Sequence, residues 1–571
     1  MAVNRFRISL NNAEFPLVST LAQRAVFFPA LDNAPRVPRY AHGTDISADY
    51  NMARVIFGEN VMPIAEGFSS VGYEQWIPPA DPKAVQFDKI FALRDEDENV
   101  VLYSPARGEN FLHNKDDNVW ESNPLPDIVG GPLDANASGY PYTSAPVTYA
   151  YVDGKTFVCY ARQVSMENED VSILFWNSET KSLEPAGALI ANLPFAVGQI
   201  DGISSSNGYL LVWSDIAVAW APFDGAAFNF SNFENGNFTT SGSQIPEDVQ
   251  GKIRAIGRLA GGFIMFTNKN AVAAQYNANN QVSPWIFSQV QNCGGIETFE
   301  QMTVESSLGT IMAYTTTGFQ SISLNKAENI HPQVSDFIAG KRIEFYDFAT
   351  AQIARYTSTL DFFTKVTAIG SRYLVISYGT FPGFYNFALV YDITLQRWGK
   401  LRIQHVDCFY YSYDPRTRPL TYGMAQVPYD FPPLGSYLDT AFLSNPLVSV
   451  QNAIAFLDYN GEVKIADWSE YARPEIDQAM LMIGRVQLKR ETGVQINRVE
   501  VEGLRAGDIV IDPSLDGAEL QPPVSPMLVE DSPRRKLFGT MLECLNFNIT
   551  LRGTFSATTL IAEAISTGQV S

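Results

Sequence analysis

The sequence has few of the residues that cross-link small secreted domains or bind metals. Its 571 residues include only four cysteines and four histidines. The cysteines form no C-x-x-C pair, so we expect free thiols in a reducing compartment. The histidines form neither H-x-x-x-H nor H-E-x-x-H, and we interpret them as hydrogen-bonded structural residues rather than metal ligands. The residues concerned are Cys159, Cys293, Cys408 and Cys544, and His42, His113, His331 and His405.

Long apolar runs are missing as well. The first residues, MAVNRFRISLNNAEF, lack the apolar stretch of a signal peptide. No stretch approaches the 18 or more apolar residues of a membrane-spanning helix. We therefore expect that the protein does not insert into a membrane. We expect it to be made in the cytoplasm.

Basic residues are scarce relative to acidic ones. The chain has 40 Lys and Arg against 61 Asp and Glu, a formal net charge of −21. A protein that grips duplex DNA normally has a basic excess, so any DNA contact is expected to be weak. The one basic triplet, Arg534-Arg535-Lys536, follows Asp531-Ser532-Pro533. Two interpretations stay open for it: an exposed turn, or a contact to an acidic partner or to DNA phosphate.

Recognisable catalytic motifs are also lacking. The chain contains no phosphate loop, no strand–G-x-G-x-x-G–helix signature and no G-x-S-x-G elbow. The acidic runs at 95–98 and 116–117 do not have the spacing of a calcium loop, and we interpret them as solvated turns. A facing carboxylate pair of the glycosidase type stays open, because 61 acids offer many pairs. We expect no catalytic, cofactor-binding or metal-binding residues, and no enzyme activity.

What the chain has in abundance is β-forming sequence in series. Apolar residues make up 46% and aromatic residues 12%. Strand pairs with glycine-containing turns recur, and Asp153-Gly154, Asn207-Gly208 and Asn460-Gly461 are dipeptides typical of tight primed hairpin turns. A repeat of about 40–50 residues built only of strands predicts an all-β fold with a β-propeller of about six blades. Hairpin units begin near residues 89, 147, 200, 255, 302, 366 and 453.

The character of the sequence divides the chain into three parts. We expect an N-terminal arm over 1–85, the propeller over 86–472, and a β-rich C-terminal platform over 473–571 that N-terminal residues join. In the platform, Val499 and Val501 alternate with charged residues, and 546–552 alternates in the same way, the pattern of half-buried strands. Short helices are predicted after Pro246 and within 335–348, and long loops over 124–146 and 415–446.

A resemblance follows from residues 252–401. This stretch contains IRAIGRLAGGFIMFTNKNAVAAQY, CGGI, IMAYTTTGFQSISL, HPQVSDFI, RYLVISY and FALVYDITLQRWGKL in that order. The succession resembles the tail nozzle proteins of short-tailed bacteriophages, also called tail hub or packaged-DNA stabilisation proteins. In that family a strand pair leads through a G-I linker to a V-Y-D strand that ends in a tryptophan. The motifs cover about a quarter of the chain, and the remainder is similar in layout alone.

The resemblance implies a structural protein of the virion tail, made in the host cytoplasm. In the family a homohexameric ring lies below the portal and its adaptor, extends the DNA exit channel, and helps retain and release the genome. The implied partners are further copies of the chain, the portal adaptor protein, other tail proteins such as fibres or a needle, and passing double-stranded DNA that is not bound tightly.

Two other functions stay open. One is a propeller enzyme acting on glycans, such as a glycosidase, or a lactonase. The other is a receptor-binding or fibre-like tail protein. The missing leader and metal motifs disfavour a secreted enzyme, and the lack of long repetitive β-helical or coiled-coil stretches disfavours a fibre.

Overall fold

The chain is mostly β-strand. The computed structural model contains, among the described residues, one α-helix, α1 (Pro332–Ala339), and two short 3-10 helices, η3 (Ala186–Ala188) and η4 (Phe299–Gln301). The predicted all-β class is therefore confirmed. The description covers residues 4–568 except 12, 14–29, 32–54, 81–86, 88, 95–99, 106–109, 115–116, 124–146, 162–172, 196–198, 232–240, 280–282, 304–308, 340–341, 348–351, 358–362, 382, 414–450, 469–478, 489–492, 506, 515–523 and 533.

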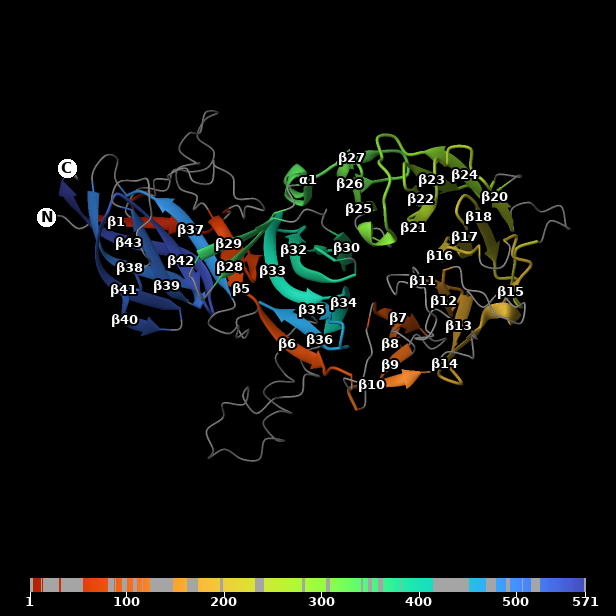
Figure 1. Cartoon of the computed structure of the whole chain (residues 1–571), viewed down its shortest axis with the longest axis horizontal. Coiled ribbons are helices and arrows are strands. Elements are labelled where there is room, and N and C mark those ends of the chain that lie inside the picture. The colour runs from red at the N-terminus through yellow and green to blue at the C-terminus, as the bar shows by residue number, and fades with distance from the viewer. Residues whose placement is uncertain are drawn as a thin grey trace.

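Among the described residues, seven groups of antiparallel strands follow one another along the middle of the chain (Figure 1). Six are separate sheets and the sixth in order, over residues 363–405, is one end of a 12-stranded sheet; we call each group a sheet. The first sheet contains β7 (Phe91–Arg94), β8 (Val100–Pro105), β9 (Asn110–Asn114) and β10 (Val119–Asn123). The second contains β11 (Val147–Val152), β12 (Lys155–Tyr160), β13 (Ile173–Asn177) and β14 (Ser182–Pro185). The third contains β16 (Gly202–Ser206), β17 (Tyr209–Trp213), β18 (Val218–Pro222) and β20 (Gly242–Gln244). Two short strands, β15 (Ile190–Ala191) and β19 (Phe228–Asn229), pair in parallel beside the third sheet.

The remaining four sheets continue in the same direction. The fourth contains β21 (Ile253–Leu259), β22 (Gly262–Thr267), β23 (Ala271–Tyr276) and β24 (Trp285–Gln289). The fifth contains β25 (Ile311–Thr315), β26 (Gly318–Ile322) and β27 (Ala327–Asn329). The sixth contains β30 (Phe363–Ile369), β31 (Tyr373–Gly379), β32 (Tyr385–Asp392) and β33 (Arg397–His405). The seventh contains β34 (Asp407–Tyr413), β35 (Gln451–Leu457), β36 (Val463–Asp467) and β6 (Gly72–Ile77).

The seventh sheet takes its last strand from near the N-terminus. β6 pairs antiparallel with β36, so that Ile77 faces Val463 and Gly72 faces Asp467. The predicted boundary at residue 85 therefore cuts through a sheet, because residues 72–77 belong with strands that lie hundreds of residues later.

Each sheet packs on the next through buried apolar side chains, and the succession closes on itself. Facing sheets that bury apolar residues against one another are the standard way to build a β core. Figure 1 shows the sheets arranged one after another round a shared centre. Pairs that share a cluster are Leu93 with Val158, Phe157 with Leu210, Trp220 with Phe263, Phe266 with Ile311, Phe319 with Leu374, Val375 with Phe456, and Leu457 with Trp120, which returns to the first sheet.

The C-terminal region forms two layers of strands that pack face to face, which we call the C-terminal sheets. One is the rest of the 12-stranded sheet that begins with β30–β33, and it contains β1 (Asn4–Ser9), β2 (Ala30–Leu31), β43 (Ser556–Gly568), β38 (Gly493–Arg505), β41 (Arg535–Cys544) and β40 (Met527–Ser532). The other contains β3 (Val55–Glu59), β37 (Met480–Val486), β42 (Asn546–Arg552) and β39 (Asp508–Ser514). Val499 and Val501 of β38 share a buried cluster with Ile549 of β42, and Phe6 and Ile8 of β1 join it.

A short hairpin connects the C-terminal sheets to the sixth sheet. Its strands are β4 (Val61–Ile64), which pairs with β33, and β5 (Gly67–Ser70), which pairs with β43. Glycines allow the close approach on both sides: a Cβ on Gly67 would lie 2.0 Å from the Ala557 carbonyl oxygen, and one on Gly399 would lie 2.6 Å from that of Val61.

Turn chemistry was predicted correctly in two hairpins and wrongly in one. Asp153 and Gly154, with φ of 49° and 73°, and Asn207 and Gly208, with φ of 50° and 81°, are both left-handed, as a type I′ turn requires. Between β35 and β36 only Gly461 has positive φ, at 84°, and the connection is longer than two residues. The Asn460-Gly461 pair therefore does not form the expected primed turn.

Both helix predictions need correction. No helix follows Pro246: the apolar residues Ile253 and Ile256 that suggested helical spacing lie in strand β21, where both are buried. In the second case α1 ends at Ala339, and β28 (Arg342–Asp347) begins a two-stranded ribbon with β29 (Gln352–Thr357). The predicted loops over 124–146 and 415–446 lie outside the described residues.

Candidate functional site

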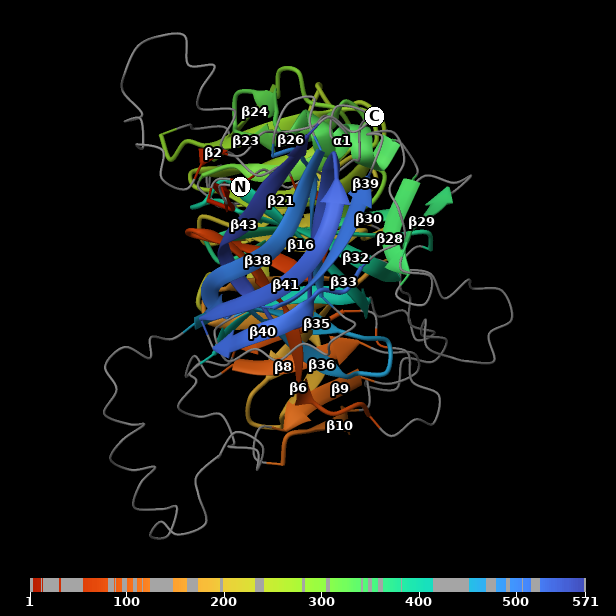
Figure 2. The same ribbon diagram turned by 90° about the vertical axis from the view of Figure 1, so that its left-hand side faces the viewer.

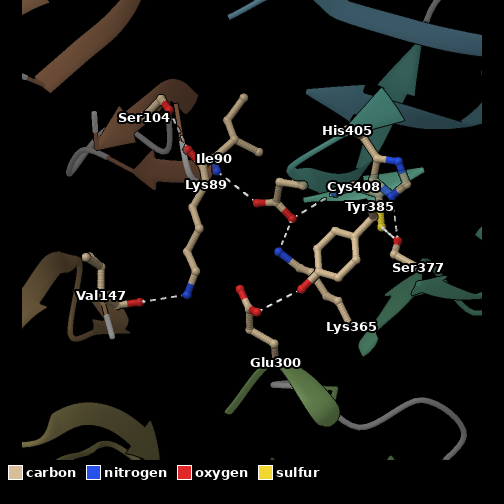
Figure 3. A network of polar contacts seen from close by, with 11 residues as sticks. Lys89, Ile90, Ser104, Val147, Glu300, Lys365, Ser377, Tyr385, His405 and Cys408 are labelled. Atoms are coloured by element: carbon tan, nitrogen blue, oxygen red, sulfur yellow. Dashed lines mark hydrogen bonds and ion pairs between the residues drawn. The ribbon is translucent and has the colours of Figure 1, made fainter. Parts of the chain in front are cut away.

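A polar network lies where the ends of several sheets meet (Figure 3). Its centre is an ion pair between Lys365 of β30 and Asp407, the first residue of β34. The Asp407 carboxylate also accepts the backbone N–H of Ile90, at 2.9 Å, and that of Cys408, at 2.8 Å. Burial lowers the pKa of the Lys365 ammonium, but the nearby carboxylates of Asp407 and Glu300 outweigh it, so the pKa is raised and the group stays charged.

Further polar contacts extend this network to neighbouring elements. Tyr385 donates its hydroxyl hydrogen to Glu300 of η4, at 2.8 Å. Lys89, just before β7, donates to the Val147 carbonyl oxygen at 3.4 Å, and its ammonium lies 3.3 Å from the centre of the Phe299 ring. The network therefore joins the first, second, sixth and seventh sheets with η4, and the charges of Lys365 and Asp407 neutralise one another.

A serine–histidine pair beside this network has the atoms of a nucleophile and a base but not the access. His405 Nδ1 lies 2.8 Å from the Ile403 carbonyl oxygen and Nε2 lies 2.7 Å from Ser377 Oγ. A donating Nδ1–H leaves Nε2 to accept the serine hydroxyl hydrogen. Both side chains are fully buried, however, and burial lowers the pKa of His405 to about 3. We therefore interpret the pair as a structural contact. Cys408 lies next to Ser377, and burial raises the pKa of its thiol to about 11.

A partly open pocket of about 530 Å³ lies beside β26 and β27. Gln320 crosses it and donates to the Asn292 carbonyl oxygen and to Asn329 Oδ1, both at 2.9 Å. Burial raises the pKa of the Cys293 thiol to about 12, so it is protonated at neutral pH. The lining supplies neither a charged group nor an activated nucleophile. It consists of Asn292, Cys293, Thr317, Gln320, Ala327 and Asn329.

The part of the chain that the structure describes holds no group of three or more His, Cys, Asp and Glu side chains arranged to bind a metal ion. Of the histidines, His113 contacts Asn118 at 3.0 Å, and His331 packs against Tyr391 and Trp398. The acidic run 95–98, Asp116 and His42 lie outside the described residues. The absence of catalysis stays a prediction.

The basic triplet lies at the turn from β40 to β41. Arg534 is exposed in the turn. Arg535 forms an ion pair with Glu500 of β38, and Lys536 contacts Asp508 at 3.0 Å. Two of the three charges are therefore paired within the subunit, and Arg534 projects beyond them. The contact of this triplet to an acidic partner stays a prediction.

The same corner of the molecule carries an exposed apolar surface that the sequence analysis missed. β40 is the last strand of its sheet, and its residues are exposed almost throughout. We call the side chains of Met527, Leu528, Val529 and Met541 the β40 edge patch; they are 73%, 42%, 53% and 88% exposed. The signal in the sequence was the run Met527-Leu528-Val529 directly after a proline-rich turn.

Comparisons with known proteins leave the family open. Neither the family models nor the curated proteins give a match. Among solved structures, U3-55K has a TM-score of 0.32 at 10% identity and covers 58% of this chain and 85% of its own. The extracellular domain of the putative one component system BT4673 from B. thetaiotaomicron has a TM-score of 0.38 at 8% identity, over 89% of this chain and 62% of its own. Hsv2 of Kluyvelomyces marxianus has a TM-score of 0.25 at 10% identity, over 56% and 97%. Similarities this weak assign no function.

The helix among the described residues is too short to cross a bilayer.

Proposed function

We propose that this chain is the subunit of the nozzle of a short bacteriophage tail. Six copies form a ring in the virion, below the portal and its adaptor protein. The ring extends the DNA exit channel and helps to retain and release the genome. The motif succession over residues 252–401 is the basis of this assignment, and the build of the chain supports it.

We further propose that the seven sheets are the blades of a β-propeller. The cyclic sharing of apolar clusters, from Leu93 with Val158 round to Leu457 with Trp120, supports this arrangement. The count of seven lies at the upper end of the predicted range, because β6 completes the seventh sheet.

The observation that carries the function is the two-part build. A large succession of sheets continues through β4 and β5, within one 12-stranded sheet, into the pair of C-terminal sheets that takes in the N-terminal strand β1. One buried cluster, which contains Leu374 and Ile549, spans both parts. A nozzle subunit of this family needs such a division, with an outer propeller and a platform near the channel. In the proposed propeller, Lys365 is paired with Asp407, and Tyr385 donates a hydrogen bond to Glu300. These contacts do not favour an enzyme.

The net charge fits a channel through which DNA slides. With −21 formal charges per copy, a ring repels phosphate over the Debye length of about 8 Å rather than binding it. We expect the channel to be lined mainly by acidic and neutral polar side chains.

The test is the mass and shape of the purified full chain, together with its place in the particle. Light scattering on the eluting protein should give six copies, and electron microscopy should show rings. Antibodies against the chain should label the tail of intact virions. A monomer that hydrolyses glycans, or a trimer of fibrous shape, would overturn the proposal.

A further inference from the structure

The β40 edge patch joins two features that each call for a partner. A strand at the edge of a sheet exposes unpaired backbone N–H and C=O groups, which natural proteins normally protect with charges, prolines or a covering segment. β40 presents Met527 and Val529 beside the exposed charges of Glu530 and Asp531, with Met541 on the neighbouring strand β41. Its pairing with β41 has a bulge between Leu528 and Glu530. On its outer side β40 pairs with no strand in the described parts of the chain.

A second unpartnered element stands elsewhere on the molecule. Within the described parts of the chain, β28 and β29 pair only with each other, from Arg342 with Thr357 to Asp347 with Gln352. A two-stranded ribbon alone is marginally stable in water, and a third strand or a packing surface is needed to fix it. Figure 2 looks onto the C-terminal sheets and shows the ribbon projecting on a different flank from β40.

We propose that the β28–β29 ribbon of one subunit adds to the β40 edge of the next, so that the C-terminal sheet continues from copy to copy. This inference rests on the proposed ring, because a closed ring requires two different patches on each subunit that fit one another. β40, β28 and β29 are each six residues long, so a ribbon strand matches β40 in length.

The chemistry of the two partners suits strand addition. Main-chain hydrogen bonds would supply the affinity, and side chains alternating on the two faces would supply the specificity. Addition would satisfy the open backbone groups of β40, place side chains beside Met527 and Val529 of the β40 edge patch, and give the ribbon its third strand. A second copy is the occupant that meets all three needs, because the same chain carries both unpartnered elements.

The first test removes the edge. Val529→Lys with Met541→Lys places two charges on the patch, and lysine at an edge is a common device against pairing. We expect this variant to be monomeric at concentrations where the unaltered chain forms rings. The matched control is Ile286→Lys: Ile286 is 45% exposed on β24, the last strand of another sheet, and this variant should keep the ring. Circular dichroism verifies that both variants fold.

The second test links the two elements covalently. Val529→Cys is combined in turn with Ile343→Cys, Tyr346→Cys, Ile353→Cys and Tyr356→Cys, which sample both ribbon strands and both faces. Oxidation of at least one pair should give a ladder of oligomers that ends at the ring. The unaltered chain is the background, since three of its four cysteines are buried and Cys293 is half-buried.

The outcomes separate the two proposals. If the unaltered chain forms rings and the lysine variant keeps them, the β40 contact is wrong and the nozzle assignment stands. If Val529→Cys alone gives only dimers, β40 pairs with itself and the ribbon contact is wrong. If the unaltered full chain is monomeric, both proposals are overturned.

Discussion

Lys365 and Asp407 form an ion pair between neighbouring sheets in which both side chains are about nine-tenths buried, with 11% and 8% exposed. Asp407 also fixes the backbone of Ile90, from the first sheet, and of Cys408. One carboxylate thus links the first, sixth and seventh sheets, at the point where the succession of sheets closes.

Removing one partner of this pair should be strongly destabilising. Asp407→Ala leaves the Lys365 ammonium buried without its carboxylate, and we expect a loss of about 3–5 kcal/mol in the free energy of unfolding. The control is Asp215→Ala, which removes the partner of Lys252 in a pair that is largely exposed and should cost less than about 1 kcal/mol. Chemical denaturation measures both. Equal losses in the two variants would contradict the special position of Asp407.

His405 should make the protein sensitive to acid. Burial lowers its pKa to about 3 in the folded chain, whereas the unfolded chain takes up a proton near pH 6.5. The contribution of His405 is therefore unchanged above pH 6.5 and is lost as the pH falls from 6.5 towards 3, by up to about 1.4 kcal/mol per pH unit. In His405→Gln the slope of the free energy of unfolding against pH should decrease by the amount that corresponds to one bound proton. Urea denaturation across that pH range gives the slopes, and identical slopes would refute the assignment.

Strand β1 should be essential to the C-terminal sheets despite its distance in sequence. Ile8 is fully buried in the shared core, opposite Leu560 of β43. Ile8→Ala should cost about 2–5 kcal/mol, as large-to-small substitutions in cores do. Ile286→Ala, at a 45% exposed position, should change stability by no more than about 0.5 kcal/mol. Thermal and denaturant unfolding of the two variants would show whether the N-terminal strand contributes as expected.

Gly67 should tolerate no side chain at the joint between the two parts. A Cβ there would lie 2.0 Å from the Ala557 carbonyl oxygen, so β5 and β43 must separate to accept it. We expect Gly67→Ala to cost about 1–3 kcal/mol, the range for overpacked sites. Gly187 has open space around the corresponding position, and Gly187→Ala should be nearly neutral. A neutral Gly67→Ala would mean that the joint is looser than described.

Duplex DNA should bind weakly and without a steep salt dependence. Acidic residues outnumber basic ones by 61 to 40, so the chain repels phosphate and should release few counterions from DNA. We expect no tight complex at low salt and little change as salt rises. If the proposed ring encloses a channel, replacing several of the acids that line it by lysine should create binding that falls steeply with salt. Fluorescence anisotropy with a labelled duplex measures this, and tight salt-sensitive binding by the unaltered protein would contradict the electrostatic argument.

Local signals in the sequence predicted local structure well. Asp153-Gly154 and Asn207-Gly208 determine their hairpins, since both residues of each pair adopt left-handed φ. Sequence spacing failed where strand and helix patterns overlap. Ile253 and Ile256 fit a helical period, yet both are buried in β21, which is covered on both faces.

Long-range pairing was beyond the reach of sequence patterns. Alternation in β42 predicted a half-buried strand, but Asn546, Asn548 and Thr550 are as buried as their apolar neighbours, at 2%, 3% and 2% exposure. What covers a sheet face depends on the packing of distant segments. For the same reason the sequence around Ser377 did not predict its contact with His405. The sequence of β40 did not predict that this strand lies at the edge of its sheet.

The pairing of β6 with β36 has a consequence for the order in which the chain can fold. Ile77 meets Val463, about 390 residues further along, so the seventh sheet cannot be completed until residue 463 has been synthesised. At about 5–20 residues per second, β6 waits roughly 20–80 s for its partner. Throughout that time its backbone is available to β36 strands of other chains. We expect newly made protein to depend on chaperone cover, and chains shortened before residue 463 to associate with one another through β6.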